Sequence, residues 1–261
     1  MTPSVSRASG EAETESLAGP HAIHEALRGG RRSLRRILVA RQQEGGIIAT
    51  ILRLARERGV PVEIRARGEL DRLVRGAGHQ GIVAEAEIFR YADAGAIVSR
   101  AATSPEGAFL VVLDGVQDPQ NLGAILRSAE AAGAHGVILP RDRAAGVSPA
   151  VVRASAGATE HLPVAQVTNL AMFLDSAKAE GLWVAGADPE GESLLFRADF
   201  SRPLVLVIGA EAHGLRPLVR RRCDFRVRIP LAGQVSSLNA SCAAAVCLFE
   251  VVRQRRGTGP G

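Results

Sequence analysis

Three polar segments follow predicted strands, and each contains residues that could bind or transform a ligand. The first, LDGVQDPQNLGAILRSAE at 113–130, places Asn121 at a predicted helix start and Arg127 six residues later. Free backbone N–H groups at a helix start can bind a phosphate, and an arginine on that helix can hold it with two hydrogen bonds. A capped helix with a surface pair between Arg127 and Glu130 would produce the same spacing. Spacing alone favours this simpler interpretation.

The second segment, LVLVIGAEAHGLRP at 204–217, holds Glu211 between Gly209 and Gly214, directly after an apolar strand. Glycine lets a ligand approach the backbone closely, and a carboxylate at a strand end can accept hydrogen bonds from hydroxyl or amide groups. The alternative is an ordinary strand-to-helix turn with a charged tip. Charged residues seldom occupy such a tight turn without a partner, so the pattern favours a functional Glu211.

The third segment, IPLAGQVSSLNASCAAAVCLFE at 229–250, places Ser236, Ser237 and Asn239 before an alanine-rich helix. Serine and asparagine at a helix start are common caps, which is the simpler interpretation. However, long polar loops often carry binding groups. The small residues of the helix predict very close packing, either against a partner subunit or at a crowded helix crossing.

A repeating strand–helix pattern positions all three segments. Short apolar runs predict buried strands, helical stretches lie between them, and a last helix runs from about Leu238 to Arg253. This alternation predicts an α/β fold with a mostly parallel sheet covered on both faces, in which ligands bind at the carboxyl ends of the strands. The predicted strands span 109–114, 136–140, 181–187, 203–209 and 225–230.

The chain divides into four predicted parts. Residues 1–20 are small and polar, which predicts a disordered tail. Residues 21–91 alternate helical and strand-like patterns and predict a compact α/β unit. Residues 92–108 contain many small residues and a Ser-Pro break, which indicates a linker. Residues 109–257 carry the strand–helix repeat.

Composition excludes several classes of protein. Of the 261 residues, 46% are hydrophobic and 23% are charged, which is typical of a globular chain with a substantial core. No apolar run approaches the roughly 20 residues needed to span a bilayer. The three cysteines form no C-x-x-C pair, so we expect neither a disulfide framework nor a bound metal. The first residues lack the basic and apolar stretches of a secretory signal, so the expected location is cytoplasmic.

Several common enzyme motifs are missing from the sequence. It contains no G-x-G-x-x-G after the first strand of the second unit, no P-loop, no H-E-x-x-H and no G-x-S-x-G. An ordinary NAD enzyme, ATPase, zinc protease or serine hydrolase is therefore not expected. Charge is more informative, because residues 21–95 carry 14 arginines against nine acidic residues. That excess suits an anionic partner such as RNA, although a solvated surface in an arginine-rich protein is an equally good interpretation.

Taken in order, the three segments resemble the three signature motifs of the SpoU/TrmH family of RNA ribose 2′-O-methyltransferases. GPHAIHEAL at 19–27 and HQGIVA at 79–84 resemble the small N-terminal substrate-binding domain of this family. QVSSLNASCAAAVCLFEVVRQR at 234–255 is most similar to the bacterial members that methylate a guanosine in 23S rRNA. The resemblance implies a Rossmann-like C-terminal sheet with a deep trefoil knot, the SPOUT fold, preceded by a small ribosomal-protein-like (L30e-like) α/β domain.

The resemblance also implies a reaction and its residues. S-adenosylmethionine would donate a methyl group to a ribose 2′-oxygen without a metal, and would be bound largely by backbone groups near Gly209, Ile229 and Leu238. Arg127 matches the catalytic arginine of the family; because arginine stays protonated at neutral pH, it suits a phosphate clamp better than a simple base. Four further polar positions would order the loops and the ribose: Asn121, Glu211, Ser237 and Asn239.

The implied partners are RNA, most directly 23S rRNA, and a second copy of the chain, since the family is homodimeric with its active site near the subunit interface. Neither a membrane nor DNA is implied. Four arginines of the N-terminal unit are candidate phosphate contacts: Arg31, Arg32, Arg35 and Arg36. Three alternatives remain: the same chemistry on tRNA or another rRNA nucleotide, a non-catalytic RNA-binding assembly factor, and a metabolite-binding α/β protein outside the family. The intact polar positions argue against the non-catalytic alternative.

Overall fold

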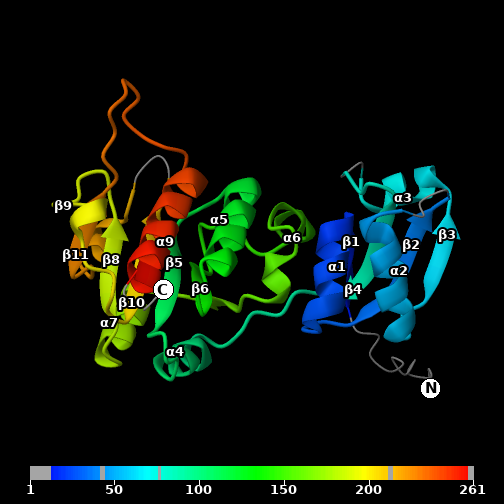
Figure 1. Cartoon of the computed structure of the whole chain (residues 1–261), viewed down its shortest axis with the longest axis horizontal. Helices are drawn as coiled ribbons and strands as arrows, with labels where there is room; N and C mark the ends of the chain where they lie inside the picture. The colour runs from blue at the N-terminus through cyan, green and yellow to red at the C-terminus, as the bar shows by residue number, and fades with distance from the viewer. Residues whose placement is uncertain (1–12, 42–44, 76–77, 211–213, 258–261) are drawn as a thin grey trace, which may run out of the picture.

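The computed structural model describes residues 13–41, 45–75, 78–210 and 214–257. Two β-sheets lie side by side along the long axis of the molecule, each with its own helices (Figure 1). The smaller sheet is formed by the N-terminal part of the chain, and the larger sheet by the C-terminal part.

The smaller sheet contains β1 (Thr14–Ala18), β2 (Leu34–Ala40), β3 (Val62–Arg65) and β4 (Ile82–Glu87), with helices α1 (Pro20–Gly29), α2 (Ile47–Glu57) and α3 (Arg67–Leu73). The strand order is β1-β4-β2-β3, and β2 and β3 run parallel while β4 is antiparallel to both its neighbours. Apolar side chains of α1 and α2, such as Ile23 and Ile51, are buried together on one face. Leu70 of α3 is buried against the other face.

Residues 14–20 are ordered, so the prediction of a disordered tail through residue 20 is wrong for this stretch. Strand β1 pairs with β4 along its whole length, and its Leu17 is fully buried. Pro20 then begins α1, a position that suits proline because no intrahelical N–H bond is needed there. The local sequence Thr-Glu-Ser-Leu-Ala is too short and polar to indicate a strand, and only pairing with a distant strand defines it.

The larger sheet has seven strands: β5 (Phe109–Asp114), β6 (Gly136–Pro140), β7 (Val164–Val167), β8 (Trp183–Ala187), β9 (Ser193–Leu194), β10 (Leu204–Gly209) and β11 (Phe225–Arg228). Their order is β7-β6-β5-β10-β8-β11-β9, and all the pairings are parallel. The prediction of a parallel α/β sheet is therefore confirmed. Strands β7 and β9 were not predicted, because both are short and neither contains a continuous apolar run.

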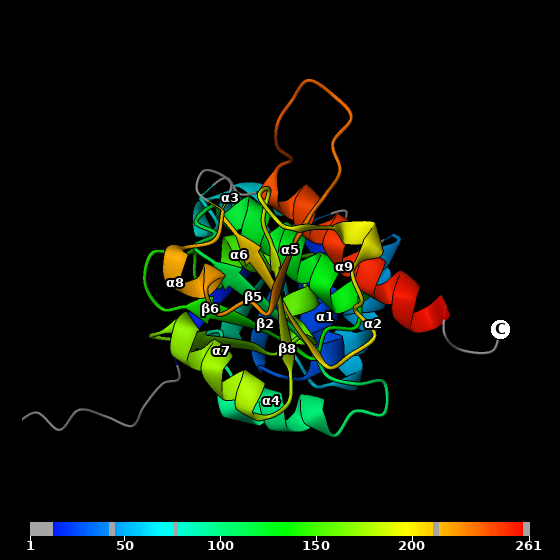
Figure 2. The same cartoon turned by 90° about the vertical axis from the view of Figure 1, so that its left-hand side faces the viewer.

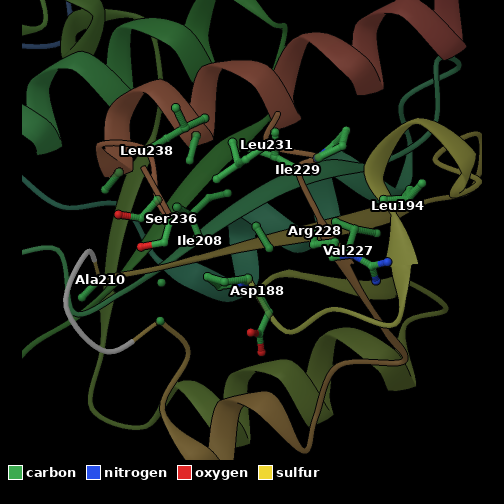
Figure 3. Close-up of a pocket in the computed structure, with 18 residues that line it drawn as sticks. Asp188, Leu194, Ile208, Ala210, Val227, Arg228, Ile229, Leu231, Ser236 and Leu238 are labelled. Carbon is green, nitrogen blue, oxygen red and sulfur yellow. The ribbon is translucent and has the colours of Figure 1, made fainter. Parts of the chain in front are cut away.

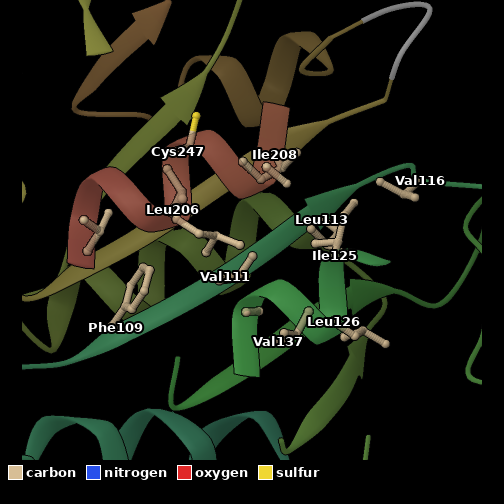
Figure 4. Packing of buried hydrophobic residues seen from close by; sticks show 14 of the residues in the cluster. Phe109, Val111, Leu113, Val116, Ile125, Leu126, Val137, Leu206, Ile208 and Cys247 are labelled. Carbon is tan, nitrogen blue, oxygen red and sulfur yellow. The ribbon is translucent and has the colours of Figure 1, made fainter. Parts of the chain in front are cut away.

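Helices cover both faces of the larger sheet. They are α4 (Ala94–Ala102), α5 (Pro119–Ala131), α6 (Pro149–Ala154), α7 (Leu170–Ala179), α8 (Pro217–Arg220) and α9 (Ala240–Gly257), with short 3-10 turns η1 (Ala158–Glu160) and η2 (Leu195–Arg197). Phe109, Val111 and Leu113 of β5 point toward α5 and α9 (Figure 4), whereas Leu110 and Val112 between them point toward α4 and α7. This alternation explains why the strand is apolar at every position, since both of its faces are buried.

The segment at 92–108 is not a linker, because helix α4 occupies most of it. Asp93 caps the helix by accepting a hydrogen bond from the backbone N–H of Ala96. Ile97 and Val98 are buried against the larger sheet, and a Cβ atom on Gly136 of β6 would lie 2.5 Å from Cγ2 of Ile97. Ala101, one of the small residues that suggested a linker, is fully buried in the same cluster.

A buried ion pair connects the two halves of the molecule. Arg32, which precedes β2, donates to Glu160 of η1 at 2.5 Å and also to Glu15 of β1. The side chains of Arg32 and Glu160 are only 4% and 1% exposed. Nearby, Nε2 of His161 lies 2.7 Å from a carboxylate oxygen of Glu25 in α1. Burial tends to raise the pKa of Glu25, but hydrogen bonds from its histidine neighbours outweigh burial and hold it below the usual value.

Arg32→Ala is expected to destabilise the protein by about 3–5 kcal/mol, because it leaves the buried carboxylate of Glu160 without its cation. Urea unfolding would measure the loss in free energy of unfolding. The matched control is Arg28→Ala, which removes a largely exposed partner of Glu25 and should cost less than about 1 kcal/mol. Equal effects of the two substitutions would contradict the assignment of Arg32 to the fold.

Candidate functional site

The carboxyl ends of the central strands meet at one edge of the larger sheet. Gly209 at the end of β10 pairs with Asp114 at the end of β5, and Ala187 at the end of β8 pairs with both Ile208 and Val227. The segment between β11 and α9 projects from the same edge (Figures 1 and 2). All three motif segments therefore have parts at one edge, where ligands bind in parallel α/β sheets.

A cavity of about 440 Å³ lies between this edge and the projecting segment. Its lining is mainly aliphatic and backbone, and Ile208, Ile229, Leu231 and Leu238 surround the opening shown in Figure 3. Ser236 and Ser237 supply hydroxyl groups to the same cavity. The structure thus brings together the three residues expected to bind a methyl donor, Gly209, Ile229 and Leu238. We call this space the first cavity.

Gly209 is required by the close return of the chain. A Cβ atom on this residue would lie 2.3 Å from the carbonyl carbon of Gly214 and 2.8 Å from the backbone nitrogen of Leu215. Ala210 and Gly214 exchange backbone hydrogen bonds, and Gly214 adopts a φ of +57°. These contacts fix the edge of the first cavity through main-chain atoms. Glu211 lies outside the described residues, so its expected role stays a prediction.

A second, more polar cavity of about 480 Å³ adjoins the first and shares Ala210, Gly214 and Ala240 with it. The other residues that line it include Asp114, Asp118, Asn121, Arg143 and Arg216. Residues with charged and amide side chains therefore line one space beside an apolar one. This combination suits a ligand with both an apolar and an anionic part.

Asn121 and Asn239 connect the first and third motif segments. Nδ2 of Asn239 donates to Oδ1 of Asn121 at 3.0 Å, and Oδ1 of Asn239 accepts from the backbone N–H of Ser241 at 2.9 Å. Asn121 is not the cap of α5: Asp118 is, because its carboxylate accepts the backbone N–H of Asn121 at 3.0 Å. The side chain of Asn121 instead accepts a hydrogen bond from Asn239, the residue before α9.

Arg127 lies apart from both cavities of its own chain. It is exposed on α5, and neither cavity includes it. The surface pair with Glu130 is not present among the ion pairs of the described residues. Within the described part of the chain, Arg127 forms no ion pair or hydrogen bond that would explain its position.

Two buried carboxylates at the edge were not identified from the sequence. The side chain of Asp114 is fully buried and accepts from both the backbone N–H and Nε of Arg216, at 2.7 and 2.5 Å. Asp188, after β8, lines the first cavity and pairs with Arg220 and Arg226. The only signal for either in the sequence is an aspartate that ends or directly follows an apolar strand.

The four candidate RNA contacts differ in availability. The prediction for Arg32 is wrong, because its guanidinium is buried and bound by two glutamates. Arg36 is half-exposed and pairs with Glu85 and Glu63, so its charge is already compensated. Arg31 and Arg35 are exposed. RNA contacts at Arg31 and Arg35 stay predictions.

Two of the three cysteines are at least partly shielded from solvent, whereas Cys242 is exposed. Burial raises the pKa of the Cys223 and Cys247 thiols to about 12, so both stay protonated at neutral pH. No group of three or more histidine, cysteine, aspartate or glutamate side chains within the described ranges could hold a metal ion. A helix long and apolar enough to cross a membrane is likewise absent from those ranges.

Comparison with known proteins agrees with the motifs. The SpoU rRNA methylase family matches residues 108–249, and the RNA 2′-O ribose methyltransferase substrate-binding family matches residues 17–92. The 23S rRNA (guanosine-2′-O-)-methyltransferase RlmB of Pseudomonas putida is 42% identical over 94% of this chain and 98% of its own. RlmB of Bordetella pertussis is 44% identical over 94% of this chain and 100% of its own.

A solved structure extends the similarity to the fold. The SpoU methyltransferase AviRb from Streptomyces viridochromogenes, in complex with the cofactor AdoMet, superposes with a TM-score of 0.76. The two chains are 32% identical, and the match covers 94% of this chain and 91% of AviRb. The resemblance predicted from the three motifs is confirmed, and the chain belongs to the SpoU rRNA methylase family.

Proposed function

We propose that the protein transfers a methyl group from S-adenosylmethionine to the ribose 2′-oxygen of a guanosine in 23S rRNA. The observation that carries this proposal is the meeting of all three motif segments at one sheet edge, beside an apolar and a polar cavity. The RlmB relatives, which match nearly the whole chain and are named for this reaction, support the choice of substrate.

The first cavity fits S-adenosylmethionine. Its volume of about 440 Å³ lies within the roughly 300–1,000 Å³ of typical small-molecule sites. Ile208, Ile229 and Leu238 offer apolar contacts suited to an adenine ring, and the main chain around Gly209 offers polar groups at close range. When bound, the donor supplies an electrophilic methyl group on a sulfonium.

The residues of this chain would act mainly by positioning the ribose. As the 2′-oxygen bonds to the methyl carbon and the carbon–sulfur bond breaks, the hydroxyl proton must leave. We propose that Arg127 stays protonated and clamps an RNA phosphate, so that its charge or the phosphate assists removal of the proton. Asn121 and Asn239 would hold their two loops in register, while Ser237 and Glu211 would complete the order around the ribose.

Arg127 lies outside both cavities of its own chain. We propose that the protein is a homodimer in which Arg127 serves the cavities of the partner subunit. Cys242, Val246 and Phe249 form an exposed stripe on α9, on the side away from the buried residues of that helix. Val246 is 36% and Phe249 49% exposed. An apolar stripe with this helical spacing suits a helix of a second copy.

Phe249→Glu is expected to convert the dimer to a monomer, because it places a charge in the proposed apolar interface. Sedimentation analysis at micromolar concentration would measure the change in mass. Met172→Glu on α7 is the matched control, since Met172 is exposed and apolar but lies elsewhere. A monomeric wild-type protein, or an unchanged mass in the Phe249→Glu variant, would contradict the proposed interface.

Further features of the family are part of the proposal. A trefoil knot is supported by the position of β10 between β5 and β8, followed by the return of α9 to pack with α5. The mixed sheet of the N-terminal half supports an L30e-like, RNA-binding domain at residues 21–91, with Arg31 and Arg35 as phosphate contacts. Residues 109–257 would form the methyltransferase domain. The proposed location is the cytoplasm, where ribosomal RNA is assembled into ribosomes.

Transfer of labelled methyl from S-adenosylmethionine to unmodified 23S rRNA would test the function, with tRNA assayed in parallel. Label in 23S rRNA, mapped to a guanosine 2′-oxygen, is the expected result. Label in tRNA alone would keep the chemistry and overturn the substrate. RNA binding without transfer to either RNA would favour the non-catalytic alternative.

A further inference from the structure

Arg143 combines a strained backbone with an uncommitted side chain. It lies in the loop between β6 and α6 and adopts a φ of +58°, in the left-handed region that residues other than glycine rarely occupy. Arg143 is exposed and is one of the residues that line the second cavity. No ion pair or hydrogen bond joins its side chain to another residue of the described ranges. Strain of this kind concentrates at functional sites.

The loop is fixed on both sides of Arg143, so the strained conformation is held in place. The backbone N–H of Arg141 donates to Val167 at 2.9 Å, and that of Ala145 donates to the carbonyl of Val116 at 2.9 Å. Farther along, the backbone N–H of Val147 donates to the Tyr91 hydroxyl at 2.8 Å. The backbone that carries the Arg143 guanidinium is therefore held in place beside the cavity.

The acidic groups of the second cavity already accept hydrogen bonds from protein donors. Asp114 is fully buried and accepts two hydrogen bonds from Arg216. Asp118 accepts the backbone N–H of Asn121 at the start of α5, where the helix dipole favours a negative charge. Arg143 is left as the cation without a counterion inside the described part of the cavity. A singly charged anion with two acceptor oxygens, such as a phosphodiester, would match its planar donors.

The position of the second cavity beside the first indicates which phosphodiester of an RNA substrate could reach Arg143. The two cavities share Ala210, Gly214 and Ala240, so a nucleotide that presents its ribose to the first cavity extends directly into the second. We infer that Arg143 binds a phosphodiester of the RNA substrate next to the reacting ribose. The inference rests on the proposed function, because it takes the ligand of the second cavity to be the methyl acceptor.

Three substitutions separate the charge of Arg143 from its strain. Arg143→Gly removes the guanidinium but suits the positive φ, so it should fold at least as well as the wild type. It should raise KM for 23S rRNA roughly tenfold to 100-fold, with the dissociation constant of S-adenosylmethionine unchanged. Arg143→Lys should show a smaller rise in KM than Arg143→Gly, because lysine keeps the positive charge but lacks the planar pair of guanidinium donors. Arg141→Ala is the matched control, since Arg141 is exposed in the same loop but lines neither cavity.

RNA binding without catalysis gives an independent measurement. In a titration of a 23S rRNA fragment against salt, Arg143→Gly should bind more weakly than Arg141→Ala and lower the slope by about one phosphate contact, or ~0.7–0.9. An unchanged RNA affinity, an equal loss in the control, or an equal loss of donor affinity would overturn the inference. If the wild type methylates no RNA, the proposed function fails. A selective loss of RNA binding in Arg143→Gly would even then support a phosphate site.

Discussion

Arg127→Ala is expected to lower kcat for methyl transfer by about 100-fold or more, the loss typical of removing one preorganised charged group from a transition state. The substitution should leave the fold intact, because Arg127 is exposed on α5 and supports no neighbouring element. Exposed positions of this kind usually change the free energy of unfolding by less than about 0.5 kcal/mol. Donor binding should also be retained, since Arg127 does not line the first cavity.

Single-turnover transfer of labelled methyl, with calorimetry of donor binding, would measure both effects. Arg127→Lys should also lose most activity, because an ammonium cannot form the two parallel hydrogen bonds of a guanidinium. Glu130→Ala, an exposed change one turn along α5, is the matched control and should be nearly neutral. Normal turnover by the Arg127→Ala enzyme would remove this residue from the mechanism.

Mixed dimers would show in which subunit Arg127 acts. If it serves the site of the partner subunit, mixing Arg127→Ala with a donor-binding variant restores one working site in each mixed dimer. If it serves its own site, both subunits of a mixed dimer stay inactive. Because Arg127 is outside both cavities of its chain, we expect recovery of activity.

Most of the larger sheet was predictable, because β5, β6, β8 and β10 are largely apolar runs. Residues 109–114 and 136–140 match β5 and β6 at both ends. Elements defined by their partners were not predictable. Strand β1 is polar and exists by pairing with β4, and α4 is recognised by its burial against the sheet rather than by its composition.

In the candidate site, too, residues that match family motifs were predictable, whereas residues whose role depends on distant partners or on backbone conformation were not. Gly209, Ile229 and Leu238 lie far apart in the chain, and family motifs indicated that they belong together, as the first cavity now places them. The cluster of arginines around Arg32 wrongly predicted an RNA contact there, because the glutamate that neutralises Arg32 is 128 residues away in the sequence. Backbone strain also leaves no trace in composition, so Arg143 could be recognised only from its φ and its position in the second cavity.

Gly209→Val is expected to abolish donor binding, because the added side chain has no space. Even the first added carbon would meet backbone atoms of Gly214 and Leu215 at 2.3–2.8 Å, and main-chain atoms cannot move aside as the end of a side chain can. The turn must therefore shift, and with it the edge of the first cavity. Calorimetry should show an affinity for S-adenosylmethionine reduced by about 100-fold or more, equivalent to roughly 3 kcal/mol.

Two further variants separate a closed cavity from a misfolded protein. Gly233→Ala lies in the projecting segment, where an added Cβ meets no atom within 4 Å, so it should bind the donor normally. Leu238→Arg would fill the first cavity from its opposite side, and Leu238 is 39% exposed, so the fold should tolerate the change. Loss of donor affinity in Leu238→Arg, with an unchanged circular dichroism spectrum, would assign the loss to the cavity itself. Unchanged affinity in both Gly209→Val and Leu238→Arg would place the donor elsewhere, because no ligand could occupy this space alongside either side chain.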